Sequence, residues 1–151
     1  MFNKDIYSNR RKELCNQINE GVILLLGNMP IPMNYPSNTL RFRQDSNFLY
    51  YSGLDHPNLN LAIDVSSGET TLFGDDLDVD DIVWEGERIT VKEMSELSGI
   101  DYVEKTSYLS QYLSNKNKVH TLPSYREDQK SFLRSIISSQ KHSSSKELIL
   151  N

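Results

Sequence analysis

Residues 41–57 read Arg41-Phe42-Arg43-Gln44-Asp45-Ser46-Asn47-Phe48-Leu49-Tyr50-Tyr51-Ser52-Gly53-Leu54-Asp55-His56-Pro57. As an extended chain, this stretch places Phe42, Phe48 and Tyr50 on one face and polar residues on the other. The polar residues are Arg41, Arg43, Asp45 and Asn47. Burying two guanidinium groups, a carboxylate and an amide costs free energy unless these groups find partners. Two interpretations therefore stay open: a local ion pair that orders a loop, or a polar face turned toward another domain or subunit.

Arg43 and Asp45 are the natural pair within this face, because residues two apart on an extended chain point the same way. At that spacing the two side chains are close enough for a charge-assisted hydrogen bond. If the pair lies at the surface, its loss should cost less than about 1 kcal/mol.

The composition is that of one soluble globular domain. The chain has 151 residues, of which 37% are hydrophobic and 25% charged, with a formal net charge of −5. This length is sufficient for a hydrophobic core without disulfides, and the negative charge argues against nucleic-acid binding. The longest apolar run, Val22–Leu26, is far shorter than the roughly 18–20 residues that span a bilayer. The single Cys15 excludes an intrachain disulfide. With no signal-peptide pattern at the start, we expect a cytoplasmic protein without a membrane partner.

The acidic segment is the strongest charge feature. Eight acidic residues and no Lys or Arg lie between Glu69 and Glu87. Asp76, Asp78, Asp80 and Glu87 match ligand positions of a calcium loop, but its sixth position requires glycine and is Asp81 here. We therefore expect a solvated acidic loop and no calcium site.

Alternating strand and helix patterns predict an α/β domain. The expected helices cover residues 4–19, 91–98, 106–114 and 127–138, and the expected strands cover 22–26, 40–52, 59–65, 70–73, 102–103 and 119–122. The run at 22–26 is uniformly apolar, as in a strand buried on both faces. A turn at Ser67-Gly68 makes 59–73 a hairpin, so the sheet is expected to be mixed. We expect one domain over residues 1–137 and a linker beginning at 138–151.

No catalytic group can be recognised in the sequence. Cys15 falls on the apolar face of the first helix and is expected to be a structural thiol, while His56 and His120 are expected to be loop and core histidines. The sequence has no nucleophile elbow, glycine-rich phosphate loop or cluster of metal ligands. We therefore predict no catalytic residue, metal or cofactor in this chain.

The run Arg43–Gly53 followed by His56-Pro57 resembles the N-terminal domain of the Xaa-Pro aminopeptidase, prolidase and creatinase family. Features in matching order extend the resemblance over roughly residues 5–137: Arg10-Arg11 in the first helix, the strand before Gly27-Asn28, the 59–73 hairpin and Ile82-Val83-Trp84-Glu85-Gly86. The resemblance implies a ribonuclease-H-like α/β domain, with a mixed sheet of about six strands and helices on both faces.

The resemblance also implies a separate C-terminal metallopeptidase domain of the pita-bread fold. In the family, two Asp, one His and two Glu of that domain bind two divalent metal ions, usually manganese, that activate a water. None of those motifs occurs in this chain. By this resemblance the chain borders the active-site cleft and helps to build oligomers. Six residues are expected to border the cleft or face another domain: Arg41, Arg43, Asp45, Asn47, Tyr50 and Trp84.

The sequence thus predicts the non-catalytic N-terminal domain of a Xaa-Pro aminopeptidase or dipeptidase. The parent protein would hydrolyse the bond preceding proline in peptides. The expected partners are its own C-terminal catalytic domain and further copies of itself. Two alternatives stay open: an interaction module of a relative without peptidase chemistry, and a domain of a creatinase-like hydrolase.

Overall fold

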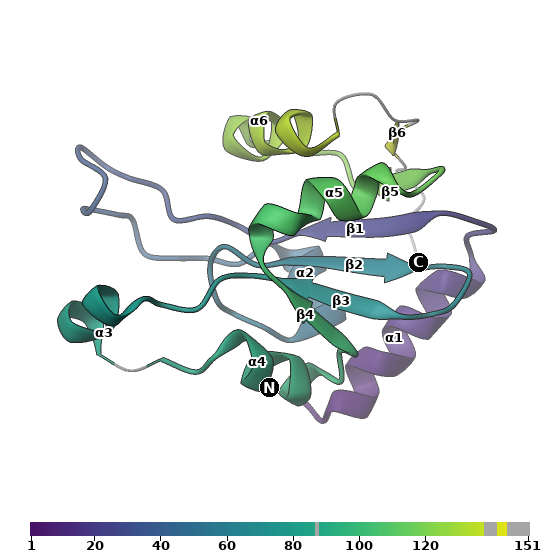
Figure 1. The fold of residues 1–151 in the computed structure, drawn as a ribbon, viewed down its shortest axis with the longest axis horizontal. Coiled ribbons are helices and arrows are strands. Elements are labelled where there is room, and N and C mark those ends of the chain that lie inside the picture. Colours follow the sequence, from purple (N-terminus) through teal and green to yellow (C-terminus); the bar gives the residue numbers. More distant parts are fainter. Residues whose placement is uncertain (87, 138–141, 145–151) are drawn as a thin grey trace.

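The structure is a computed structural model that describes residues 1–86, 88–137 and 142–144, with only the backbone described for residues 84–85 and 142–144. Its centre is β1 (Val22–Leu26), whose first four residues are buried. The other strands are β2 (Asn60–Asp64), β3 (Thr70–Phe73), β4 (Tyr102–Glu104), β5 (Val119–Thr121) and β6 (His142–Ser144). They form one mixed sheet in the order β4-β3-β2-β1-β5-β6 (Figure 1).

In the described part of the chain, six α-helices and one short 3₁₀ helix accompany the sheet: α1 (Lys4–Asn16), α2 (Ser46–Ser52), α3 (Val79–Glu85), α4 (Val91–Ser98), η1 (Thr106–Tyr108), α5 (Leu109–Ser114) and α6 (Glu127–Ile136). The helices α1, α2 and α4 cover one face of the sheet, and α5 and α6 cover the other (Figure 1). This is the predicted α/β architecture with helices on both faces.

The alternation of β1 divides the core between the two faces. Ile23 and Leu25 pack with the α1, α2 and α4 side. Val22 and Leu24 pack with Leu109 and Leu113 of α5. A strand that serves two cores must be apolar at every position, which confirms the prediction of a doubly buried strand at 22–26.

The pairing directions bring several connections to one edge of the sheet. The strand β1 pairs parallel with β5 and antiparallel with β2, which itself pairs antiparallel with β3. Consequently β1, β3 and β5 all end at the same edge. The chain leaves that edge after β1 into a long arm, residues 27–45, and after β3 toward α3 (Figure 1). The predicted hairpin at 59–73 is confirmed as β2 and β3.

Arg11 joins three helices on the first face. It is 3% exposed, and it donates hydrogen bonds to the carbonyl oxygens of Tyr51 (2.8 Å), Ser98 (2.7 Å) and Gly99 (2.9 Å). Burial lowers the pKa of this guanidinium to about 10, so the group stays charged at neutral pH. A single charged side chain thereby satisfies carbonyls at the ends of α2 and α4.

Two predicted elements are wrong in type or length. The expected strand at 40–52 is instead an irregular segment followed by the helix α2, because the Asp45 carboxylate accepts from the backbone N–H of Asn47 and Phe48 and starts a helix. The expected helix at 4–19 ends at Asn16. Gly21 leads into β1 with φ +98°, where a Cβ would meet the Lys118 carbonyl oxygen at 2.6 Å.

The other predicted helices form, with small differences at their ends. The helix α3 was not predicted: the acidic segment expected to be a solvated loop becomes helical from Val79, because the Asp78 carboxylate accepts from the backbone N–H of Asp81 and starts a helix. The structure begins residues 106–114 as η1 and continues them as α5, and it ends α6 at Ile136 rather than 138. The domain boundary expected at residue 137 stays a prediction. Of the expected linker, residues 138–141 and 145–151 lie outside the described residues, and 142–144 form β6 beside β5.

Candidate functional site

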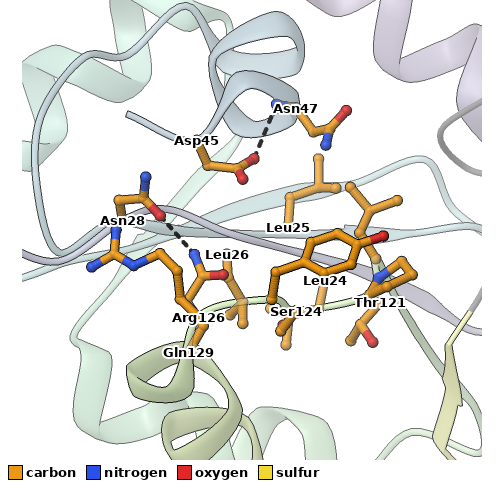
Figure 2. Close-up of a pocket in the computed structure, with 13 residues that line it drawn as sticks. Leu24, Leu25, Leu26, Asn28, Asp45, Asn47, Thr121, Ser124, Arg126 and Gln129 are labelled. Atoms are coloured by element: carbon orange, nitrogen blue, oxygen red, sulfur yellow. Dashed lines mark hydrogen bonds between the residues drawn. The ribbon is translucent and has the colours of Figure 1, made fainter. Parts of the chain in front are cut away.

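The candidate site is a crevice at the carboxyl ends of β1 and β5, formed by two adjoining pockets. The strand order places β2 on one side of β1 and β5 on the other, so the order reverses at β1. Ligands of open α/β sheets commonly bind outside the carboxyl ends of the strands at such a switch point. The smaller pocket, about 160 Å³, lies over Leu24–Leu26 and the 121–126 segment (Figure 2). The larger pocket, about 350 Å³, lies under the 27–45 arm. Both are lined by Asn28, Asp45 and Arg126.

Gln44 fixes the shape of the arm where it returns to the sheet. Its side chain is buried, with 4% exposed. The amide oxygen accepts from the backbone N–H of Asn28 (2.8 Å) and Asp45 (3.0 Å). The amide nitrogen donates to the carbonyls of Leu54 (3.0 Å) and His56 (2.8 Å). One side chain therefore holds the end of β1, the start of α2 and the 54–56 loop together.

Asp45 stands between the two pockets. One carboxylate oxygen, Oδ1, accepts from the backbone N–H of Asn47 (3.0 Å) and Phe48 (2.9 Å). The other oxygen, Oδ2, binds no group among the described residues. The side chain is half-buried, so it presents one uncommitted oxygen to the crevice. Figure 2 shows the carboxylate near Asn47, opposite the α6 side chains.

The opposite wall comes from the loop before α6 and from α6 itself. Gln129 donates from Nε2 to Oδ1 of Asn28 at 2.8 Å (Figure 2). Arg126 donates to the Met29 carbonyl at 3.3 Å and to Asp128, with 3.1 Å between Nε and Oδ1. The contacts with Asn28 and Met29 join residues about one hundred positions apart, so the crevice depends on the complete fold.

The predicted site residues are only partly brought together. Arg41 and Arg43 line the larger pocket, Asn47 lines the smaller one, and Asp45 lines both. The predicted pair of Arg43 with Asp45 is wrong. In the described part of the chain Asp45 caps α2, and the Arg43 side chain forms no ion pair.

Tyr50 lies away from the crevice. Because 46–52 is helical, Tyr50 points away from Asp45 and toward α1, where the Arg10 guanidinium lies 4.0 Å from the centre of its ring. Trp84 belongs to α3, and its side chain lies outside the described residues.

Several crevice residues were not singled out from the sequence, among them Asn28, Gln44, Tyr125, Arg126 and Gln129. The sequence did offer a reason to select Gln44, because this polar residue lies between the charged Arg43 and Asp45. The residues of the 125–129 segment had none, because nothing local indicates that this segment meets residue 28.

The crevice residues offer positive charge, hydrogen-bond donors and acceptors, and apolar surface, which are the groups that bind a ligand. They are arginines, amides, hydroxyl side chains (Ser46, Thr121, Ser124 and Tyr125), the carboxylate of Asp45 and apolar side chains. Among the residues with described side chains, no group of three or more His, Cys, Asp or Glu is placed to hold a metal ion. The donor set of the crevice therefore does not fit the family's metal pair.

The remaining chemically reactive side chains lie elsewhere. Cys15 is half-buried on α1, and burial raises the pKa of its thiol. His120 on β5 is buried, with its Nε2 2.8 Å from the Glu20 carbonyl oxygen. His56 lines a separate surface pocket beside the acidic segment. Within the described ranges of the chain, no helix is both long and apolar enough to cross a membrane.

The structure is a mixed α/β domain with a candidate binding crevice at one edge of its sheet. Residues 7–122 match the family model for the aminopeptidase P N-terminal domain. The chain belongs to this family, as the resemblance predicted.

Comparisons with individual proteins agree with this assignment. A protein of Aspergillus terreus named "Probable Xaa-Pro aminopeptidase" is 32% identical over 102 residues, which cover 68% of this chain and 22% of that protein. One of the same name from Ajellomyces dermatitidis is 29% identical over 114 residues, covering 73% and 22%. The solved structure of aminopeptidase P from Escherichia coli has the same fold, with a TM-score of 0.76 at 20% identity over 91% of this chain and 33% of that one. The matched region therefore spans about a fifth of the length of these curated relatives.

Proposed function

We propose that this chain is the non-catalytic N-terminal domain of a metal-dependent Xaa-Pro aminopeptidase or dipeptidase, whose full protein hydrolyses the peptide bond preceding proline. The observation that carries the proposal is the family match over residues 7–122, combined with relatives several times longer than the matched region. The two divalent metal ions, usually manganese, would be held by the catalytic domain of that longer protein.

In this proposal the crevice forms part of the wall of the active-site cleft. Two features support that role. The uncommitted oxygen of Asp45 and the guanidinium groups of Arg41 and Arg43 face a pocket, and the residues around them are fixed by the buried Gln44. A wall of this kind contributes to catalysis by positioning the substrate rather than by reacting with it.

Contact with a catalytic domain and with further copies of the chain is also part of the proposal. The arm between β1 and α2 exposes Ile31 (43%), Met33 (56%) and Tyr35 (56%), and α3 exposes Val79 (77%) and Val83 (75%). Apolar side chains that protrude together are typical of surfaces that become covered in an assembly. A cytoplasmic location is proposed as well, supported by the free thiol of Cys15 in a chain without a second cysteine.

The experiment combines an assay of this chain with determination of the coding region downstream of Asn151. The purified 151-residue chain should not hydrolyse Xaa-Pro peptides with added Mn²⁺, whereas the downstream region should encode the ordered set of two Asp, one His and two Glu ligands. Turnover by the purified chain would contradict the non-catalytic assignment. A downstream region without those ligands would favour the alternative of an interaction module.

A further inference from the structure

The larger pocket of the crevice carries an excess of positive charge. Three guanidinium groups line it, those of Arg41, Arg43 and Arg126, against the single carboxylate of Asp45. The whole chain has a net charge of −5, so a generally basic surface does not explain this excess. We name these residues, together with the apolar wall of Met29, Ile31, Leu40 and Phe42, the arginine pocket.

Two of the three arginine side chains in the arginine pocket have no hydrogen-bond or ion-pair partner among the described residues. Arg126 is held by Asp128 and by the Met29 carbonyl. The Oδ1 atom of Asp45 is used by the backbone of α2. The side chains of Arg41 and Arg43 bind no group in the described part of the chain, although both residues line the same pocket. Like charges near one another repel, and an anion placed between them relieves that repulsion.

The rest of the lining restricts which anion fits. Met29, Ile31, Leu40 and Phe42 supply the apolar wall beside the guanidinium groups. The volume of about 350 Å³ lies at the lower end of the range for small-molecule sites. The planar fork of a guanidinium group matches the two oxygens of a carboxylate and can bind both at once. A small anion such as phosphate would leave the apolar wall in contact with water.

We propose that the arginine pocket binds a carboxylate attached to an apolar group, the chemistry found at the last residue of a peptide ending in Leu, Ile or Phe. Arg41 and Arg43 bind the carboxylate, and the wall of Met29, Ile31, Leu40 and Phe42 covers the apolar side chain. This inference goes beyond the proposed function, because it gives the chain a ligand of its own that requires no catalytic domain. Its test is accordingly independent of peptidase activity.

The experiment is an NMR titration of the ¹⁵N-labelled 151-residue chain with N-acetyl-leucine. Saturable shifts of backbone signals from residues 28–29, 40–46 and 126 are expected. N-acetyl-leucine amide has the same apolar group without the charge, and it should bind at least about tenfold more weakly. Acetate and inorganic phosphate, which lack the apolar group, should also bind several-fold more weakly. Raising the salt concentration should weaken the binding of N-acetyl-leucine.

Two variants distinguish binding at the arginine pocket from nonspecific attraction to positive charge on the surface. The double substitution Arg41→Gln with Arg43→Gln should weaken binding of N-acetyl-leucine at least about tenfold. Neither residue is buried, so the chain should still fold, which circular dichroism would check. Arg134→Gln removes an exposed arginine on α6 and should leave the affinity within about twofold. Equal binding of the acid and its amide, equal binding of phosphate, or an unchanged affinity of the double variant would each overturn the proposal.

Discussion

Asp45 is the residue on which the start of α2 depends. Its carboxylate satisfies two backbone N–H groups that have no partner within the helix. We predict that Asp45→Ala lowers the free energy of unfolding by about 1 kcal/mol, the usual cost of losing an N-cap. Urea denaturation of the purified chain, followed by circular dichroism, measures this difference.

The matched control for Asp45→Ala is Asp45→Asn, which removes the charge and keeps an acceptor oxygen. Because Asn caps helices about as well as Asp, this variant should retain most of the wild-type stability. If Asp45→Asn is as unstable as Asp45→Ala, the charge of Asp45 matters more than its capping hydrogen bonds, and capping does not explain the start of α2.

Gly53 closes α2 in the left-handed conformation, with φ +70°. A Cβ at this position would lie 2.3 Å from Cζ of Tyr7 on α1. Gly53→Ala should therefore lower the free energy of unfolding by more than the roughly 1 kcal/mol that a left-handed backbone costs an alanine, because α1 and α2 must also move apart. Thermal unfolding of the variant and the wild type provides the measurement.

Gly68, in the turn between β2 and β3, provides the comparison for Gly53. It has a similar φ, +75°, but no atom lies within 4 Å of the Cβ that an alanine would add. Gly68→Ala should lower the free energy of unfolding only by the cost of the left-handed backbone conformation, about 1 kcal/mol. Equal losses at the two glycines would show that the contact between α1 and α2 is not tight.

An ion pair ties the end of β2 to the loop before β5. Nζ of Lys116 lies 3.0 Å from Oδ2 of Asp64. Burial acts to raise the pKa of Asp64, but hydrogen bonds from Ser66 and Lys116 outweigh it, and the pKa is lowered from 3.8. A carboxylate with a lowered pKa stabilises the fold above its unfolded pKa and loses that contribution as the pH falls through the folded one. The stabilisation should therefore be present at neutral pH and fade in the acid range below 3.8.

Lys116→Met isolates this pair, because it keeps the aliphatic stem and removes the charge. Both partners are partly exposed, so the substitution should lower the free energy of unfolding by less than about 1 kcal/mol at neutral pH. The difference from wild type should shrink in the acid range, as Asp64 becomes protonated. Urea denaturation over a pH series would test this expectation, and a difference independent of pH would contradict it.

Uniform or alternating hydrophobicity made most elements predictable. The strands β1, β2 and β3 follow directly from it, because nearly all of their residues are buried. The strand predicted at 40–52 was wrong because Phe48, Tyr51 and Ser52 are buried at helical spacing, while the neighbouring Phe42 and Tyr50 also fit an extended alternation. An Asp cap at residue 45 and a glycine at residue 53 were the signals that favoured a helix.

The arrangement of the candidate site was predictable only in part, because it depends on the whole molecule. Arg41, Arg43, Asp45 and Asn47 were expected together and do line one crevice. The side chains that complete it, Arg126 and Gln129, reach residues 28–29 only after β5 has paired beside β1. Long-range pairing of this kind leaves no local pattern in the sequence.

The central claim concerns the longer protein to which this domain is proposed to belong. The most direct measurement is the activity of the native protein, isolated from its source cells with an antibody raised against the 151-residue chain. We predict that this material cleaves a peptide immediately before proline, that EDTA abolishes the cleavage, and that Mn²⁺ restores it. Native protein that leaves the bond before proline intact in the presence of added Mn²⁺ would contradict the account.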